Sequence, residues 1–84
     1  MAKRNGFDRY LEYQYNQSGD FYMALWHAIQ FADTGNTARL AKGFPEEVEA
    51  YRIWTRVGVQ EFVKHVSPDH GLLSRLKDEY VSDL

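Results

Sequence analysis

Apolar residues recur at helical spacing along most of the chain, and the densest run lies between Asp20 and Asp33. Projected at 100° per residue, apolar side chains cover most of the circumference of this segment, and only Met23, His27 and Gln30 remain for an edge that faces solvent. A helix of this kind must be covered by neighbours on several sides. We therefore predict that this segment, residues 20–33, is a central helix that the rest of the chain surrounds.

A second long pattern begins at Pro45. Proline at the first helical position, followed by Glu46 and Glu47, is a typical helix start, because carboxylates are favoured at the positive end of the helix dipole. Apolar residues then keep a 3.6-residue phase through Gly58. We predict one long helix over residues 45–66, in which Gly58 costs about 1 kcal/mol relative to alanine and allows a kink.

The segment before the predicted central helix has a mixed pattern. Residues 7–16 carry apolar side chains both at helical spacing and in the alternation of a strand. We predict a helix, because a single strand would find no partner in this chain and would leave backbone groups unpaired. Ser18 or Asp20 is expected to cap the next helix, since either side chain accepts hydrogen bonds from the free N–H groups at a helix start.

Two further helices complete the expected fold. One covers residues 37–42 and is capped by Asn36. The other starts at Ser67 and Pro68 and runs to the end of the chain with one apolar face. Together these patterns predict an all-α fold, a compact bundle of four to five helices in a single domain over residues 1–84.

Composition indicates a folded, soluble protein. Apolar residues make up 44% of the 84 positions and aromatic residues 15%, which is too rich for a disordered chain. No apolar run approaches the ~18 residues of a membrane span. Met1 to Arg4 is basic but no apolar stretch follows it, so we expect no signal peptide and a cytoplasmic location. A chain of this size buries roughly 60% of its surface, so association would add useful stability.

Candidate chemistry is sparse. The chain has no cysteine, which excludes disulfides, thiolate catalysis and cysteine-ligated metals. His65 and His70 flank Asp69 at a loose spacing that is a weak signal for a metal pair, and Glu46 and Glu47 are better explained by the helix start. There is no P-loop, GxGxxG motif or nucleophile elbow. We therefore expect neither an enzyme nor a metal or other cofactor.

The first half of the predicted long helix carries a second apolar stripe opposite its main one, formed by Ala50, Ile53, Trp54 and Val57. Arg52 and Arg56 form a small basic stripe beside it at i,i+4 spacing. Tyr, Trp and Arg are the residues that most often anchor protein interfaces. The stripe therefore predicts a protein contact surface, although it could instead complete the internal core. The binding candidates are Ile53, Trp54, Val57, Arg52 and Arg56.

This charge pattern does not favour a nucleic-acid partner. The net charge is −2, from ten Lys and Arg against twelve Asp and Glu. Residues 37–54 have the order of a helix-turn-helix, but the second helix opens with Glu46, Glu47 and Glu49, which would meet phosphates with the wrong sign.

The run from Phe21 to Tyr51 contains Ala28-Ile29, Ala32-Asp33, Asn36, Leu40 and the stretch GFPEEVEAY from Gly43. On these residues it resembles small uncharacterised helical proteins encoded by phages and prophages. The resemblance carries over no activity, ligand or catalytic residue.

That resemblance implies a setting, the cytoplasm of a host cell. We expect a non-enzymatic protein-binding module, a phage accessory protein that docks on a host or phage protein and modulates it, with defence machinery as one option. The alternatives are a structural homo-oligomer that needs no other partner and, less favoured, a nucleic-acid-associated regulator.

Overall fold

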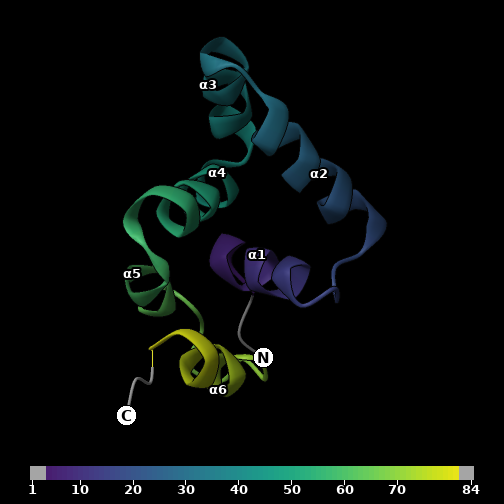
Figure 1. The fold of residues 1–84 in the computed structure, drawn as a ribbon. Helices are drawn as coiled ribbons and strands as arrows, with labels where there is room; N and C mark the ends of the chain where they lie inside the picture. The colour runs from purple at the N-terminus through teal and green to yellow at the C-terminus, as the bar shows by residue number, and fades with distance from the viewer. Residues whose placement is uncertain (1–3, 82–84) are drawn as a thin grey trace.

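All regular elements in residues 4–81, the part of the chain that our computed structural model describes, are helical (Figure 1). The all-α prediction is therefore confirmed. Two of the elements are π-helical segments, η1 and η2. In chain order the elements are α1 (Gly6–Gln14), α2 (Asp20–Phe31), α3 (Thr34–Gly43), α4 (Pro45–Arg52), η1 (Ile53–Val57), α5 (Val59–Val63), α6 (Leu73–Leu76) and η2 (Lys77–Val81). No helix among these residues is long and apolar enough to cross a membrane.

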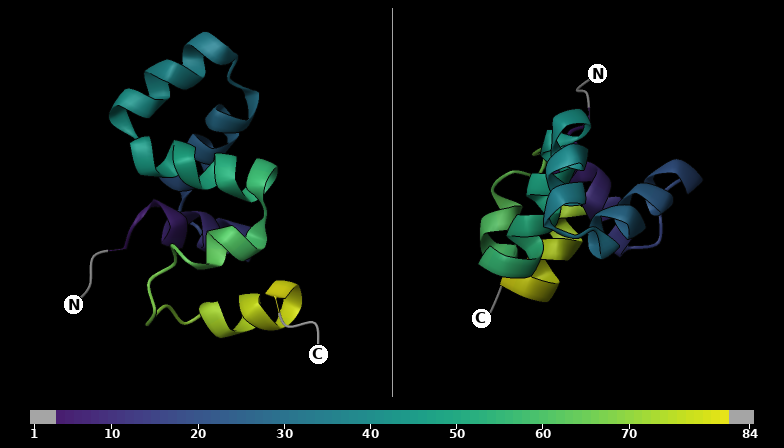
Figure 2. Two further views of the ribbon diagram at one scale, coloured as in Figure 1. Left: turned by 90° about the vertical axis from the view of Figure 1, so that its left-hand side faces the viewer. Right: turned by 90° about the horizontal axis from the view of Figure 1, so that it is seen from above.

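The helix that the others surround is α1, and the prediction of a central helix over residues 20–33 is wrong. Six of the nine residues of α1 are buried, against three of the twelve in α2. In Figure 1, α1 lies in the middle of the molecule between α2, α4 and α6. Seen from above in Figure 2, α2 (blue) lies at one edge. Although apolar residues lie around most of the circumference of α2, other helices do not cover it on all sides.

The first turn of α1 is held by its own cap and by the start of α4. The Asn5 side chain accepts from the Asp8 N–H at 2.8 Å, and the Asp8 carboxylate accepts from the Asn5 N–H at 3.2 Å, which is a capping box. The Gly6 N–H donates to Glu46 Oε1 at 3.0 Å. A Cβ on Gly6 would lie 2.6 Å from the Glu46 carbonyl carbon, so glycine permits the close approach of α1 to α4.

The predicted long helix over residues 45–66 is interrupted. The Gly58 N–H donates to the Ile53 carbonyl at 2.8 Å, an i to i−5 bond that closes η1. Gly58 itself has φ 136° and ψ 158°, which glycine adopts and other residues avoid. The break redirects α5, so that Phe62 reaches the core and is fully buried. Continuous helical phase in the sequence therefore does not require a continuous helix.

Three predicted caps differ in the structure. Gly19 is the N-cap of α2 and provides no side-chain hydrogen bond, so neither Ser18 nor Asp20 caps that helix. Asp33 caps α3 by accepting from the Asn36 N–H at 2.8 Å, which places Asn36 inside the first turn. Ser67 starts a turn rather than a helix, and α6 begins only at Leu73. The helix predicted over 7–16 is confirmed as α1.

An aromatic cluster around Tyr10 forms the centre of the core. The Tyr10 ring centroid lies 4.8 Å from that of Trp26, 5.7 Å from Trp54 and 6.0 Å from Phe62. Rings from α1, α2, η1 and α5 thus meet at one residue of the central helix. Burial raises the pKa of Tyr10 to about 12, because the phenolate would lose its hydration.

Candidate functional site

The five sequence-predicted binding residues do not form one surface. Ile53 is 5% exposed and belongs to the core, so it offers very little surface to a partner. Val57 is 55% exposed, and Arg52 and Arg56 are exposed as well. Trp54 is half-buried. The alternative interpretation of the stripe, completion of the core, therefore holds for Ile53, while the binding role of the other four stays a prediction.

Packing around η1 explains this division. The Trp54 ring lies between Phe62 at 5.0 Å and Tyr80 at 5.6 Å, which leaves only part of it open to solvent. The Arg52 guanidinium makes two hydrogen bonds to Glu49, at 2.9 and 2.6 Å, and lowers the pKa of that carboxyl. Of the predicted set, only Arg56 and Val57 combine high exposure with no such partner among residues 4–81.

Another exposed apolar surface lies on α2. Phe31 is 80% exposed and Phe21 is 60% exposed, and Ala24 and Ala28 between them are exposed as well. These four residues are spaced 3, 4 and 3 positions apart, so they share one face of the helix. We call this face, formed by Phe21, Ala24, Ala28 and Phe31, the α2 stripe. Met23, 42% exposed, lies on the same exposed half of the helix.

A shallow groove adjoins the α2 stripe at the corner between α2 and α3. Its lining is mainly apolar and contains a single charged side chain, that of Arg39, and no carboxylate. The lining residues are Ala28, Phe31, Ala32, Asn36, Arg39 and Leu40. Within residues 4–81, Arg39 makes no ion pair. The corner thus combines apolar anchoring area with an available cation.

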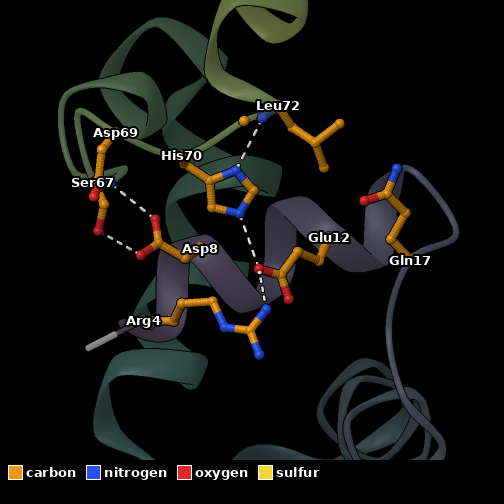
Figure 3. A pocket seen from close by; sticks show the side chains of 9 residues that line it. Arg4, Asp8, Glu12, Gln17, Ser67, Asp69, His70 and Leu72 are labelled. Atoms are coloured by element: carbon orange, nitrogen blue, oxygen red, sulfur yellow. Dashed lines mark hydrogen bonds and ion pairs between the residues drawn. The ribbon is translucent and has the colours of Figure 1, made fainter. Parts of the chain in front are cut away.

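A second candidate site is the polar pocket between α1 and the loop over residues 67–72 (Figure 3). Asp8, fully buried, accepts from the Ser67 N–H at 2.8 Å and from the Ser67 hydroxyl at 2.5 Å. With the Asn5 N–H, three donors face one carboxylate. Both oxygens of this carboxylate are therefore hydrogen-bonded inside the protein.

Glu12, one turn further along α1, lies in the same pocket. Its Oε2 accepts from Arg4 at 3.0 Å and from His70 Nε2 at 2.9 Å. The Leu72 N–H donates to His70 Nδ1 at 3.0 Å, so Nδ1 must be an acceptor. The ring therefore carries its proton on Nε2 and donates it to Glu12. Both ring nitrogens are occupied by these contacts.

This arrangement does not provide an activated nucleophile. A serine nucleophile needs a base that takes its proton and a third group that orients the base. The Ser67 hydroxyl is bonded to Asp8, whereas His70 is bonded to Glu12 and Leu72. The side chains of Asp8, Glu12, Ser67 and His70 therefore bond to one another or to the backbone and join α1 to the 67–72 loop.

The two histidines of the weak metal pattern have separate partners. The His65 ring stacks on the Phe7 ring, with 4.6 Å between the ring centroids, and its Nε2 lies 3.1 Å from a Glu61 oxygen. The hydrogen bond from His65, and to a smaller extent the one from Lys64, lowers the pKa of Glu61. His70 faces Glu12. Within residues 4–81, no three His, Asp or Glu side chains form a group that could hold a metal ion.

Sequence reasoning missed both groups of residues. Asp8 and Glu12 are acids at i,i+4 spacing in the segment of mixed pattern, and the signal was this spacing, which places both on one face of a helix, away from Tyr10. The exposure of Phe21 and Phe31 had no signal of its own, because an apolar helix surface looks the same in sequence whether it is covered or open.

Comparison with protein-family models, with curated proteins and with solved structures gave no match for this chain.

Proposed function

We propose that this protein is a non-enzymatic protein-binding module that uses the α2 stripe as its contact surface. One observation carries the proposal: Phe31 and Phe21 are 80% and 60% exposed on the same face of one helix. Fully burying a phenylalanine side chain contributes about 1.5–3 kcal/mol. Phe31 is almost uncovered, and Phe21 is more than half exposed although its ring packs against Tyr22 and Phe44, so a partner could bury much apolar area here. Contiguous exposed apolar surface of this kind typically marks an interaction site.

The polar pocket is a weaker basis for function. The carboxylates of Asp8 and Glu12, the histidine and the serine of this pocket already have partners within the chain. A ligand there would have to displace these contacts, whereas a partner on the α2 stripe would displace only water. This difference favours binding over catalysis.

The setting we propose is that of a phage accessory protein acting on a host protein, with defence machinery as one option. The support is the resemblance of residues 21–51, a range that contains the whole α2 stripe and the adjoining groove. In this proposal α1 and the 67–72 loop form a rigid base, and α2 presents the contact residues at the edge of the molecule.

Self-association is the second candidate, and one observation favours it. The α2 stripe has the same order in both directions, with large residues at its ends and alanines in the middle. An antiparallel second copy would therefore present an equivalent surface, as a two-fold interface requires. Such a homo-oligomer would need no other partner.

Light scattering and affinity capture together test both candidates. We expect wild-type protein to retain a specific protein from a bacterial host lysate, and Phe31→Ser to lose it while keeping its helical circular dichroism. Tyr80→Ser is the matched control, because it also removes an exposed aromatic side chain, 52% exposed, but lies on η2, outside the stripe. The captured protein must then bind purified wild-type protein. A wild-type dimer that Phe31→Ser converts to a monomer, with no other partner retained, would favour the homo-oligomer instead.

A further inference from the structure

The lining of the groove between α2 and α3 is apolar with one basic side chain, and this composition indicates the kind of partner that would bind there. Ala28 and Ala32 leave room for a bulky apolar side chain, with Leu40 and Phe31 beside it. Arg39 is the only charged residue in its lining. A complementary surface would therefore bring an apolar anchor together with negative charge.

The charged side chains around the groove also favour a negatively charged partner. Helix α3 contains Arg39 and Lys42 and no acidic residue. The neighbouring depression shares Ala32 with the groove and has no carboxylate in its lining. Of its two arginines, Arg52 is paired with Glu49, whereas Arg56 has no ion pair among residues 4–81. Asp33, at the corner itself, already accepts from the Asn36 N–H as the cap of α3. The corner is thus locally basic on a protein whose net charge is −2.

We infer that this groove receives an acidic amphipathic helix of another protein, with one bulky apolar side chain against Ala28 and Ala32 and a carboxylate paired with Arg39. The inference rests on the proposed protein-binding function. A groove between two helices commonly binds an amphipathic helix. The bound helix inserts apolar anchor residues at positions i, i+3 and i+4. The anchor and the acid would then lie about one turn apart on the partner helix.

A second copy of this chain fits the groove less well. The face of α2 that a second copy would present carries one carboxylate, that of Asp20, at the end of the helix. An acidic helix from another protein can instead place its carboxylates along the whole length of the groove. Charge complementarity therefore favours a different protein as the occupant.

The test uses a displayed library of helical peptides of about 15 residues, long enough to be partly helical in isolation. The library is selected on full-length wild-type protein. We expect selected peptides to combine a large apolar residue with Asp or Glu one turn away. Their affinity should fall about ten-fold or more in Arg39→Glu, should decrease with added salt and should be lost in Phe31→Ser. Lys77→Glu, the same charge change on η2, is the matched control and should leave binding unchanged.

The other outcomes separate the inference from the function beneath it. Peptides that require Phe31 but show no acidic preference and no response to Arg39→Glu would overturn the acidic partner and leave the α2 stripe as a binding surface. A selection that yields no Phe31-dependent peptide would overturn both proposals. Circular dichroism of each variant, whose changed side chain is exposed, verifies that loss of binding is not loss of fold.

Discussion

The Asp8 carboxylate accepts hydrogen bonds from both the backbone N–H and the hydroxyl of Ser67, a residue 59 positions away in the chain. Asp8 is fully buried in α1, and Ser67 opens the turn that leads to α6. This contact fixes the segment before α6 to the central helix. It gives a stabilising role to a serine that the sequence suggested as a helix cap.

Replacing Asp8 by alanine should therefore destabilise the protein by about 3 kcal/mol, because the Ser67 and Asn5 N–H groups would lose a charged acceptor in a buried site. Urea denaturation followed by circular dichroism measures the change. Asp78→Ala is the control, since Asp78 is exposed on η2 and should cost less than about 0.5 kcal/mol. Equal stability of the two variants would contradict the role of Asp8.

Ile53 and Val57 should respond in opposite ways to the same substitution. Ile53→Asp places an unpaired carboxylate in the core and is expected to unfold a domain of this size. Val57→Asp changes a residue that is 55% exposed and should leave the helical circular dichroism spectrum intact. A folded Ile53→Asp protein would show that the second apolar stripe of the predicted long helix is open to solvent, which is what the contact-surface prediction requires.

Gly58→Ala should destabilise the protein by about 1–3 kcal/mol, although a Cβ at that position has nothing within 4 Å. The cost is conformational, because Gly58 has φ 136° and alanine avoids this region. Gly43→Ala, at the end of α3, also has open space around it, and its effect should be neutral or slightly stabilising. Thermal unfolding of both variants measures the difference, and a stabilising Gly58→Ala would favour a continuous long helix.

Tyrosine ionisation should reduce stability at alkaline pH. The pKa of Tyr10 in the folded protein is raised to about 12 from the ordinary value of 10.0, mainly by burial. The folded state therefore binds the phenolic proton more tightly than the unfolded state does. This contribution is fully present below pH 10 and is lost as the pH rises through about 12.

Ultraviolet titration of tyrosinate, combined with denaturation at each pH, measures this linkage. Tyr10→Phe should remove the part of the alkaline loss that belongs to Tyr10. Tyr15, whose pKa is also raised to about 12 by burial and by its hydrogen bond to Glu79, should retain its own part. An unchanged pH profile in Tyr10→Phe would show that its phenol titrates normally in the folded state.

Local patterns in the sequence predicted the elements well where the signal was local. Proline with two carboxylates marked the start of α4 at Pro45, and helical spacing marked α1 and α2 close to their observed bounds. Periodicity and capping act within one or two turns, so the sequence carries them directly. The all-α fold, with no strand among residues 4–81, follows from these patterns.

Only the tertiary structure decided which helix is central, where the long helix ends and which apolar side chains stay open. Tyr10 and Phe31 are both aromatic residues on helices, yet one is 4% and the other 80% exposed. The difference depends on which elements pack against each helix, and that depends on the direction the chain takes at Gly58 and at the turn after Ser67. A residue's own sequence neighbourhood determines the face of the helix on which it lies. Whether anything covers that face is determined by contacts between segments far apart in the chain, and these are absent from any local pattern.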